Sequence, residues 1–124
     1  MSVVPVIRCT DMARSLAFYT GVLDFRLKYP GQSHEDLVID IVNDMAELQL
    51  SVLGGDGVFG SATNIGVMDV DALFKMCVAR GLDASKRPNS PVHRGPVDQT
   101  WGKREFYVTD PDGNTLRFGQ VIED

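Results

Sequence analysis

The side chains best suited to chemistry gather around one predicted hairpin near the C-terminus. Bulky apolar residues alternate with smaller or polar ones over residues 104–109 and 115–120, and Asp-Pro-Asp-Gly-Asn separates the two runs. This turn sequence supplies the fixed φ of proline and the positive φ of glycine that a tight reversal needs. Trp101 precedes the first strand and Arg117 lies in the second. An indole and a guanidinium would therefore flank one sheet surface where a ligand can bind.

A second set of polar side chains lies on an earlier predicted strand. Polar and apolar residues alternate over residues 47–52, which places Glu47 and Gln49 on one face and the leucines on the other. We expect the leucines to pack under a helix and the polar face to line a concave surface, where Arg117 can pair with Glu47. Two alternatives follow. Either the pair has a purely structural role, or Arg117 contacts an anionic or carbonyl group of a ligand.

The elements that must position these residues form a repeat. A β-branched strand over residues 3–9 precedes Asp11, which has the type and place of an N-cap before an amphipathic helix. The same pattern returns 58 residues later, with a strand at 64–68, Asp69 as the cap, and a helix that stops at Gly81. The other strands predicted for the first half are residues 25–28, 36–42 and 47–53, with a turn at residues 43–45. The chain thus uses one βαβββ unit twice.

The composition is typical of one compact domain. The 124 residues suffice for a core without crosslinks, and we place the two modules at about residues 1–56 and 57–124. Cys9 and Cys77 fall in a predicted strand and helix, so we expect two small buried hydrophobes rather than a disulfide. Residues 84–99 are polar and contain three prolines, which favours a loop with room for a short edge strand.

Charge and hydropathy exclude several partners. The formal net charge of −5 disfavours binding to a nucleic-acid backbone and mildly favours a cationic ligand. No apolar run of about 18 residues occurs, and the first residues lack the pattern of a signal peptide. We therefore expect a soluble, cytoplasmic protein that contacts no membrane and no nucleic acid.

Four segments together carry a family resemblance: residues 4–19, 22–25, 69–81 and 101–118. They resemble the vicinal oxygen chelate superfamily, which includes glyoxalases, bleomycin resistance proteins and ring-cleaving dioxygenases. Val-Pro-Val near the start and Trp-Gly-Lys-Arg-Glu-Phe before the turn are most similar to the bleomycin-resistance branch. The resemblance implies an α+β fold of two βαβββ modules whose curled sheets surround a cavity, commonly in a homodimer with shared grooves.

The resemblance also gives positions for a metal. Enzymes of this superfamily hold a divalent metal with His or Glu on the first and last strands of both modules. Those places here hold Val4, Ala62 or Asn64, Arg117, and Glu47 with Gln49 on the same face. A site needs about three neutral imidazole or anionic ligands, and a guanidinium about 4 Å from a dication opposes binding by about 8 kcal/mol at an effective dielectric near 20. We therefore expect no metal and no other cofactor.

Aromatic residues and a histidine complete the predicted groove. Trp101 either packs against its neighbours or, as the resemblance favours, forms a wall for a flat heteroaromatic group. Phe59, in a Gly-rich segment, would supply an opposing wall from the partner subunit. We expect His93 to be solvated near the groove rather than a general base, because no carboxylate accompanies it at a defined spacing.

Three functions are consistent with these residues. The leading hypothesis is a metal-free protein that sequesters a flat aromatic, cationic ligand unchanged, in a dimer groove. The rival is a metal-dependent lyase, isomerase or dioxygenase that uses displaced ligands such as Glu47 and His93. The third is a scaffold whose cavity is filled by side chains. Under the leading hypothesis the chain has no catalytic residues, and the ligand contacts Trp101, Arg117, Glu47, Gln49, Phe59 and His93.

Overall fold

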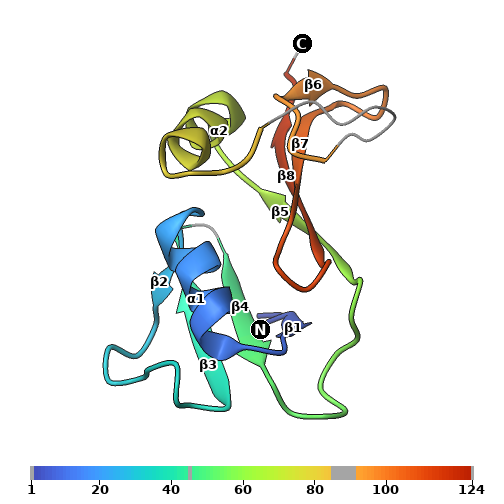
Figure 1. Ribbon diagram of the computed structural model, residues 1–124. Coiled ribbons are helices and arrows are strands. Elements are labelled where there is room, and N and C mark those ends of the chain that lie inside the picture. The colour runs from blue at the N-terminus through green and yellow to red at the C-terminus, as the bar shows by residue number, and fades with distance from the viewer. Residues whose placement is uncertain (1, 45, 85–91, 124) are drawn as a thin grey trace.

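The computed structural model describes residues 2–44, 46–84 and 92–123, and its two halves share one order of elements (Figure 1). The first half contains β1 (Val6–Arg8), α1 (Met12–Gly21), β2 (Arg26–Leu27), β3 (Val38–Val42) and β4 (Glu47–Ser51). The second half contains β5 (Ala62–Gly66), α2 (Val70–Ala79), β6 (Val97–Asp98), β7 (Lys103–Thr109) and β8 (Thr115–Val121). The predicted α+β fold of two βαβββ units is therefore confirmed.

Each half forms an open four-stranded mixed sheet. The strand orders are β1-β4-β3-β2 and β5-β8-β7-β6. In both sheets the opening strand runs parallel to the last strand, and the other neighbours are antiparallel. Among the described residues, the outer strands of each sheet pair on one side only. The last hairpin of each half, β3–β4 or β7–β8, therefore has its final strand in the interior of a sheet.

Both helices begin at the predicted caps. The carboxylate of Asp11 accepts from the backbone N–H of Arg14 at 3.2 Å, and that of Asp69 accepts from the N–H of Ala72 at 3.0 Å. These bonds satisfy one of the free N–H groups at each helix start. After α2, Gly81 adopts φ 108, which lets the chain turn back. No helix in the described part of the chain combines the length and apolarity needed to cross a bilayer.

Some strand bounds differ from the predictions. The strand predicted at residues 3–9 is shortened to β1, because Pro5 has no N–H for the ladder and contributes only its carbonyl, to Gln49 N at 2.9 Å. The strand predicted at 64–68 forms two residues earlier, since pairing with β8 sets its register. The short β6 lies inside the predicted loop. Met45 of the predicted turn and residues 85–91 of that loop lie outside the described residues.

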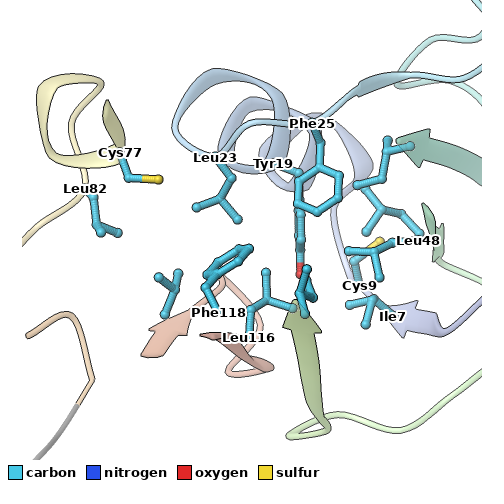
Figure 2. Packing of buried hydrophobic residues seen from close by; sticks show 14 of the residues in the cluster. Ile7, Cys9, Tyr19, Leu23, Phe25, Leu48, Cys77, Leu82, Leu116 and Phe118 are labelled. Atoms are coloured by element: carbon cyan, nitrogen blue, oxygen red, sulfur yellow. The ribbon is translucent and has the colours of Figure 1, made fainter. Parts of the chain in front are cut away.

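A continuous apolar core joins the helices to both sheets. Figure 2 shows Leu23, which follows α1, pointing toward Phe118 of β8, with Cys77 and Leu82 beyond it, and all four belong to one buried cluster. Cys9 and Cys77 are buried free thiols, as the sequence predicts. The two halves therefore share one hydrophobic core instead of having a core each.

The turn of residues 110–114 ties the halves together through polar contacts. The hydroxyl of Tyr19 in α1 donates to Asp110 Oδ2 at 2.8 Å. Asn114, fully buried, donates from Nδ2 to the carbonyl of Arg8 at 2.9 Å and accepts at Oδ1 from the N–H of Ser61 at 3.2 Å. Burying a polar group is costly unless it is hydrogen-bonded. The turn therefore depends on contacts that exist only when the first half is folded.

Candidate functional site

The second sheet has one face toward α2 and one face away from it. Phe106 stacks on Phe118 and meets Phe74 of α2, while Arg104 donates to Asp71 of α2, so these residues define the helix side. Strand alternation directs their neighbours to the opposite face, which we call the open face. The open face carries Asn64, Lys103, Glu105, Tyr107, Arg117 and Gly119.

Trp101 lies at the tip of the β6–β7 hairpin, at the edge of the open face. Gly102 has φ 84, which permits the tight turn, and Gln99 N donates to the carbonyl of Lys103 at 2.7 Å across it. The indole is 60% exposed, yet its Nε1 donates to Glu105 Oε1 at 3.0 Å. Its ring is therefore oriented by the fold and still open to a ligand.

Glu105 and Tyr107 form a hydrogen-bonded cluster with this indole. The Tyr107 hydroxyl donates to the same oxygen, Glu105 Oε1, at 3.2 Å, and Glu105 is only 5% exposed. Burial, followed by the Glu105 charge, raises the pKa of Tyr107, so its hydroxyl stays a donor at neutral pH. Gly119 pairs with Glu105 across the strands, and a methyl group there would lie 3.3 Å from Glu105 Oε2. The glycine leaves room for the carboxylate.

Arg117 lies in the next row of the open face. It pairs with Asn64 on one side and with Tyr107 on the other. Its guanidinium carbon is 5.5 Å from the centre of the Tyr107 ring, which is a cation–π distance. Within the described residues, Arg117 makes no ion pair, so its charge is available to an anionic or carbonyl group.

A hollow of about 220 Å³ opens beside this cluster. Its lining residues are Arg94, Gly95, Val97, Gln99, Glu105, Phe106 and Tyr107. The volume is small for a drug-sized ligand but sufficient for one ring or one substituent of a larger molecule.

The predicted pair of Glu47 with Arg117 is wrong for this chain. Glu47 accepts at Oε1 from Lys28 Nζ at 2.8 Å, and Gln49 donates from Nε2 to Asp40 Oδ1 at 3.0 Å. Both therefore bind partners within the first sheet, whereas Arg117 lies in the second. Glu47 lines a separate hollow of about 570 Å³ between the ends of β1 and β4 and the strand β5.

His93 has other surroundings than predicted, and Phe59 lies at the surface. His93 is buried, so the expectation of a solvated side chain is wrong. Its backbone N–H donates to the carbonyl of Tyr107 at 2.7 Å, which joins residue 93 to β7. Its Nε2 accepts from Thr109 N at 3.0 Å, which leaves Nδ1 to donate to the carbonyl of Asp83 at 2.7 Å. Both ring nitrogens are thus engaged. Phe59 is exposed, with the Arg8 guanidinium 4.5 Å from its ring centre.

Sequence reasoning left Glu105 and Tyr107 without an assigned role. Their alternation with Phe106 indicates that they share a face, but not which face is open. The signal that distinguishes the faces is Gly119, because a glycine in the middle of a strand often marks a close approach of another group.

The donor set does not fit the divalent metal that the resemblance implies. Across the parallel strands, Val6 pairs with Gln49 and Asn64 pairs with Arg117. Valine, two amides and a guanidinium offer no anionic or imidazole ligand. Glu47, the one carboxylate among the predicted positions, already accepts from Lys28. In residues 2–44, 46–84 and 92–123, no three His, Cys, Asp or Glu side chains gather as metal ligands would.

Comparisons with known proteins agree on one family. The model of the Glyoxalase/Bleomycin resistance protein/Dioxygenase superfamily matches residues 3–118. A bleomycin resistance protein of Geobacillus stearothermophilus is 25% identical, over 97% of this chain and 96% of its own. A solved bleomycin-binding protein complexed with bleomycin superposes with a TM-score of 0.76 at 18% identity, covering 97% of this chain and 98% of the other. The bleomycin-binding protein of Streptomyces verticillus, complexed with copper(II)-bleomycin, gives 0.70 at 19% identity, with coverages of 100% and 97%.

Proposed function

This chain belongs to the Glyoxalase/Bleomycin resistance protein/Dioxygenase superfamily, and from that premise we propose that it binds and sequesters a flat aromatic small molecule without changing it. The observation that carries the proposal is the exposed indole of Trp101, held in place by Glu105. The relatives named as bleomycin resistance or bleomycin-binding proteins support the same class of ligand.

A fixed, exposed indole favours binding for two physical reasons. Stacking of aromatic rings contributes about 0.5–1.5 kcal/mol beyond the burial of area. A side chain that is already oriented loses little conformational freedom when the ligand arrives. Arg117 on the same face has a guanidinium available for an anionic or carbonyl group of the ligand.

The groove is proposed to form between two copies of the chain. The second half exposes Met68, Val97, Trp101 and Val121, which are large apolar residues. Association would cover them together with the outer strands of the sheets. In such a dimer Phe59 of a second copy would face Trp101, and Glu47 and Gln49 would border the groove. The cytoplasmic location stays a prediction.

Binding without catalysis is supported by the chemistry of the donors. Both nitrogens of His93 are hydrogen-bonded to the backbone, so this side chain has no free base for proton transfer. Arg117 lies where the family's metalloenzymes have an acidic ligand. The metal-dependent alternative therefore lacks its ligands at these positions.

Calorimetry and fluorescence test the proposal with bleomycin and with a simple bithiazole. Trp101 is the only tryptophan, so quenching of its emission reports contact at the site directly. We expect heat and quenching to saturate together, and mass spectrometry to recover the ligand unchanged. Absence of both signals at high-micromolar ligand would contradict the proposal, and a chemically altered ligand would contradict the non-catalytic part.

A further inference from the structure

Glu105 is a buried carboxylate whose hydrogen-bonding capacity is half used. Oε1 accepts from Trp101 Nε1 and from the Tyr107 hydroxyl. Oε2 accepts no hydrogen bond from any residue that the structure describes. Glu105 as a whole is only 5% exposed, so Oε2 has limited access to water and is free to accept a hydrogen bond from a ligand.

The same carboxylate has no counter-ion in the described part of the chain. Its two donors are neutral groups. Arg104, the residue before Glu105, points to the helix side, where it pairs with Asp71 at 3.0 Å and Asp98 at 3.1 Å. The cationic residues nearest in the lining and on the open face, Arg94, Lys103 and Arg117, are exposed, and none forms an ion pair with Glu105. Glu105 therefore has no ion-pair partner among the described residues.

Space for a ligand group lies beside this oxygen. Gly119 has no side chain at the cross-strand position next to Oε2, and the Lys103 side chain borders that position, with its Cδ 3.5 Å from where a Cβ of residue 119 would lie. Glu105 also lines the hollow of about 220 Å³, together with Val97, Gln99 and Tyr107. Because Oε1 binds the indole and Oε2 remains open, one side chain connects the aromatic surface with the hollow.

Resting on the proposed function, we propose that Glu105 is the anionic contact of this site and selects flat ligands that carry a protonated amine or amidine. The flat ring of the ligand stacks on Trp101, and the cationic nitrogen of the ligand enters the hollow and donates to Glu105 Oε2. A hydrogen bond between a charged donor and a carboxylate is about twice as strong as a neutral one. The exposed arginines and the lysine are screened by water and do not fill the acceptor. This assignment replaces Glu47, whose carboxylate already binds Lys28.

A matched pair of ligands isolates the charge. One is a bithiazole with a primary amine on its side chain, and the other is the same compound with the amine acetylated. For the natural chain we expect the amine to bind about tenfold more tightly or better. In Glu105→Gln, which keeps size and one oxygen acceptor, we expect this ratio to fall to about one, while the affinity for the acetylated compound changes less than about threefold.

Two further variants complete the test. Glu35→Gln removes an exposed carboxylate of the first half that lies outside the site, so it should retain the preference for the amine. Gly119→Ala brings a methyl group 3.3 Å from Oε2 and should lower the ratio without removing any charge. This last variant decides the question if circular dichroism shows that Glu105→Gln does not fold.

The outcomes separate the two proposals. If the natural chain binds both compounds equally, or if Glu105→Gln retains the preference, the role of Glu105 is wrong and the binding function stands. Should Gly119→Ala have to decide, an unchanged ratio overturns the role of Glu105 in the same way. If neither compound binds the natural chain, both proposals are overturned.

Discussion

At Trp101, one substitution distinguishes binding from folding. Trp101→Ala removes the stacking surface and one donor to Glu105, but most of the indole is exposed, so the core loses little. We expect binding of the flat ligand to weaken by about 1–3 kcal/mol, roughly 5- to 150-fold. The free energy of unfolding should change less. Calorimetry and urea denaturation measure both, and Trp101→Phe should recover part of the affinity. A loss of stability that equals the loss of binding would contradict a ligand-facing role.

At Cys77, a buried thiol predicts a pH dependence of stability. Burial raises the pKa of this thiol from 9.0 to about 11. As pH rises above about 9, the unfolded chain loses the proton while the folded chain keeps it, so stability falls between about pH 9 and 11. The effect reaches about 2–3 kcal/mol at the upper end. The stability should be fully present below about pH 9.

Urea denaturation at several alkaline pH values checks this, with Cys77→Ala as the comparison. The variant should lose stability more gradually with pH than the natural chain. Some decline should remain in both, because burial also raises the pKa of Tyr19. Parallel curves for the two proteins would show that Cys77 contributes nothing to the pH dependence.

At the scale of elements, the two helix caps should be equivalent. Asp11→Ala and Asp69→Ala each remove one bond to a helix N–H, which typically costs about 1 kcal/mol of stability. Asp44→Ala is the control, since its side chain is 93% exposed and should change stability by less than about 0.5 kcal/mol. Thermal unfolding of the three variants compares them. If either cap variant matches the control, that helix does not depend on its cap.

The repeat of strand, cap and helix was predictable because its signals are local. Each aspartate lies directly before an apolar helical pattern, and the Asp-Pro-Asp-Gly-Asn turn reverses the chain within five residues. The start of β5 was not predictable, because its register depends on pairing with β8 more than 50 residues later. The missing N–H of Pro5 explains the short β1 and was readable from the sequence.

The candidate site was predictable only in part. The hairpin placed Trp101 and Arg117 at the second sheet, and the burial of Leu48 and Leu50 was predicted correctly. Alternation gives the faces of one strand but not which sheets meet, so the pairing of Arg117 with Glu47 failed. The burial of His93 depends on backbone partners at Asp83 and Thr109, which no local pattern reveals.

At the scale of the whole molecule, we expect a dimer. The outer strands have unpaired edges, and the second half has exposed apolar side chains. Association of two copies would bury both. Sedimentation at tens of micromolar protein should give twice the chain mass of 13.6 kDa. A monomer at this concentration would exclude the shared groove, although each chain could still expose its own indole.

Divalent metals should not stabilise the protein through the cavity. A metal bound at 100 times its dissociation constant adds about 2.7 kcal/mol of stability, which a thermal scan detects. We expect Zn²⁺, Ni²⁺ and Mn²⁺ to leave the melting temperature unchanged, because Gln49, Asn64 and Arg117 offer poor ligands. A saturable increase that Glu47→Ala abolishes would revive the metal-dependent alternative.

The polar contacts of the 110–114 turn have a mechanical consequence for the hairpin. Figure 1 shows β7 and β8 extending from this turn, beside the first half, to the end where β6 lies. Seven residue pairs connect the turn to Lys103 and Trp101, a distance of about 20 Å at the usual rise of a strand. The far end is also held, because β8 pairs with β5 and Arg104 of β7 pairs with Asp71 of α2. The hairpin therefore acts as a stiff spacer between the buried turn and the indole of Trp101, so a substitution that shifts the turn would move the aromatic surface with it.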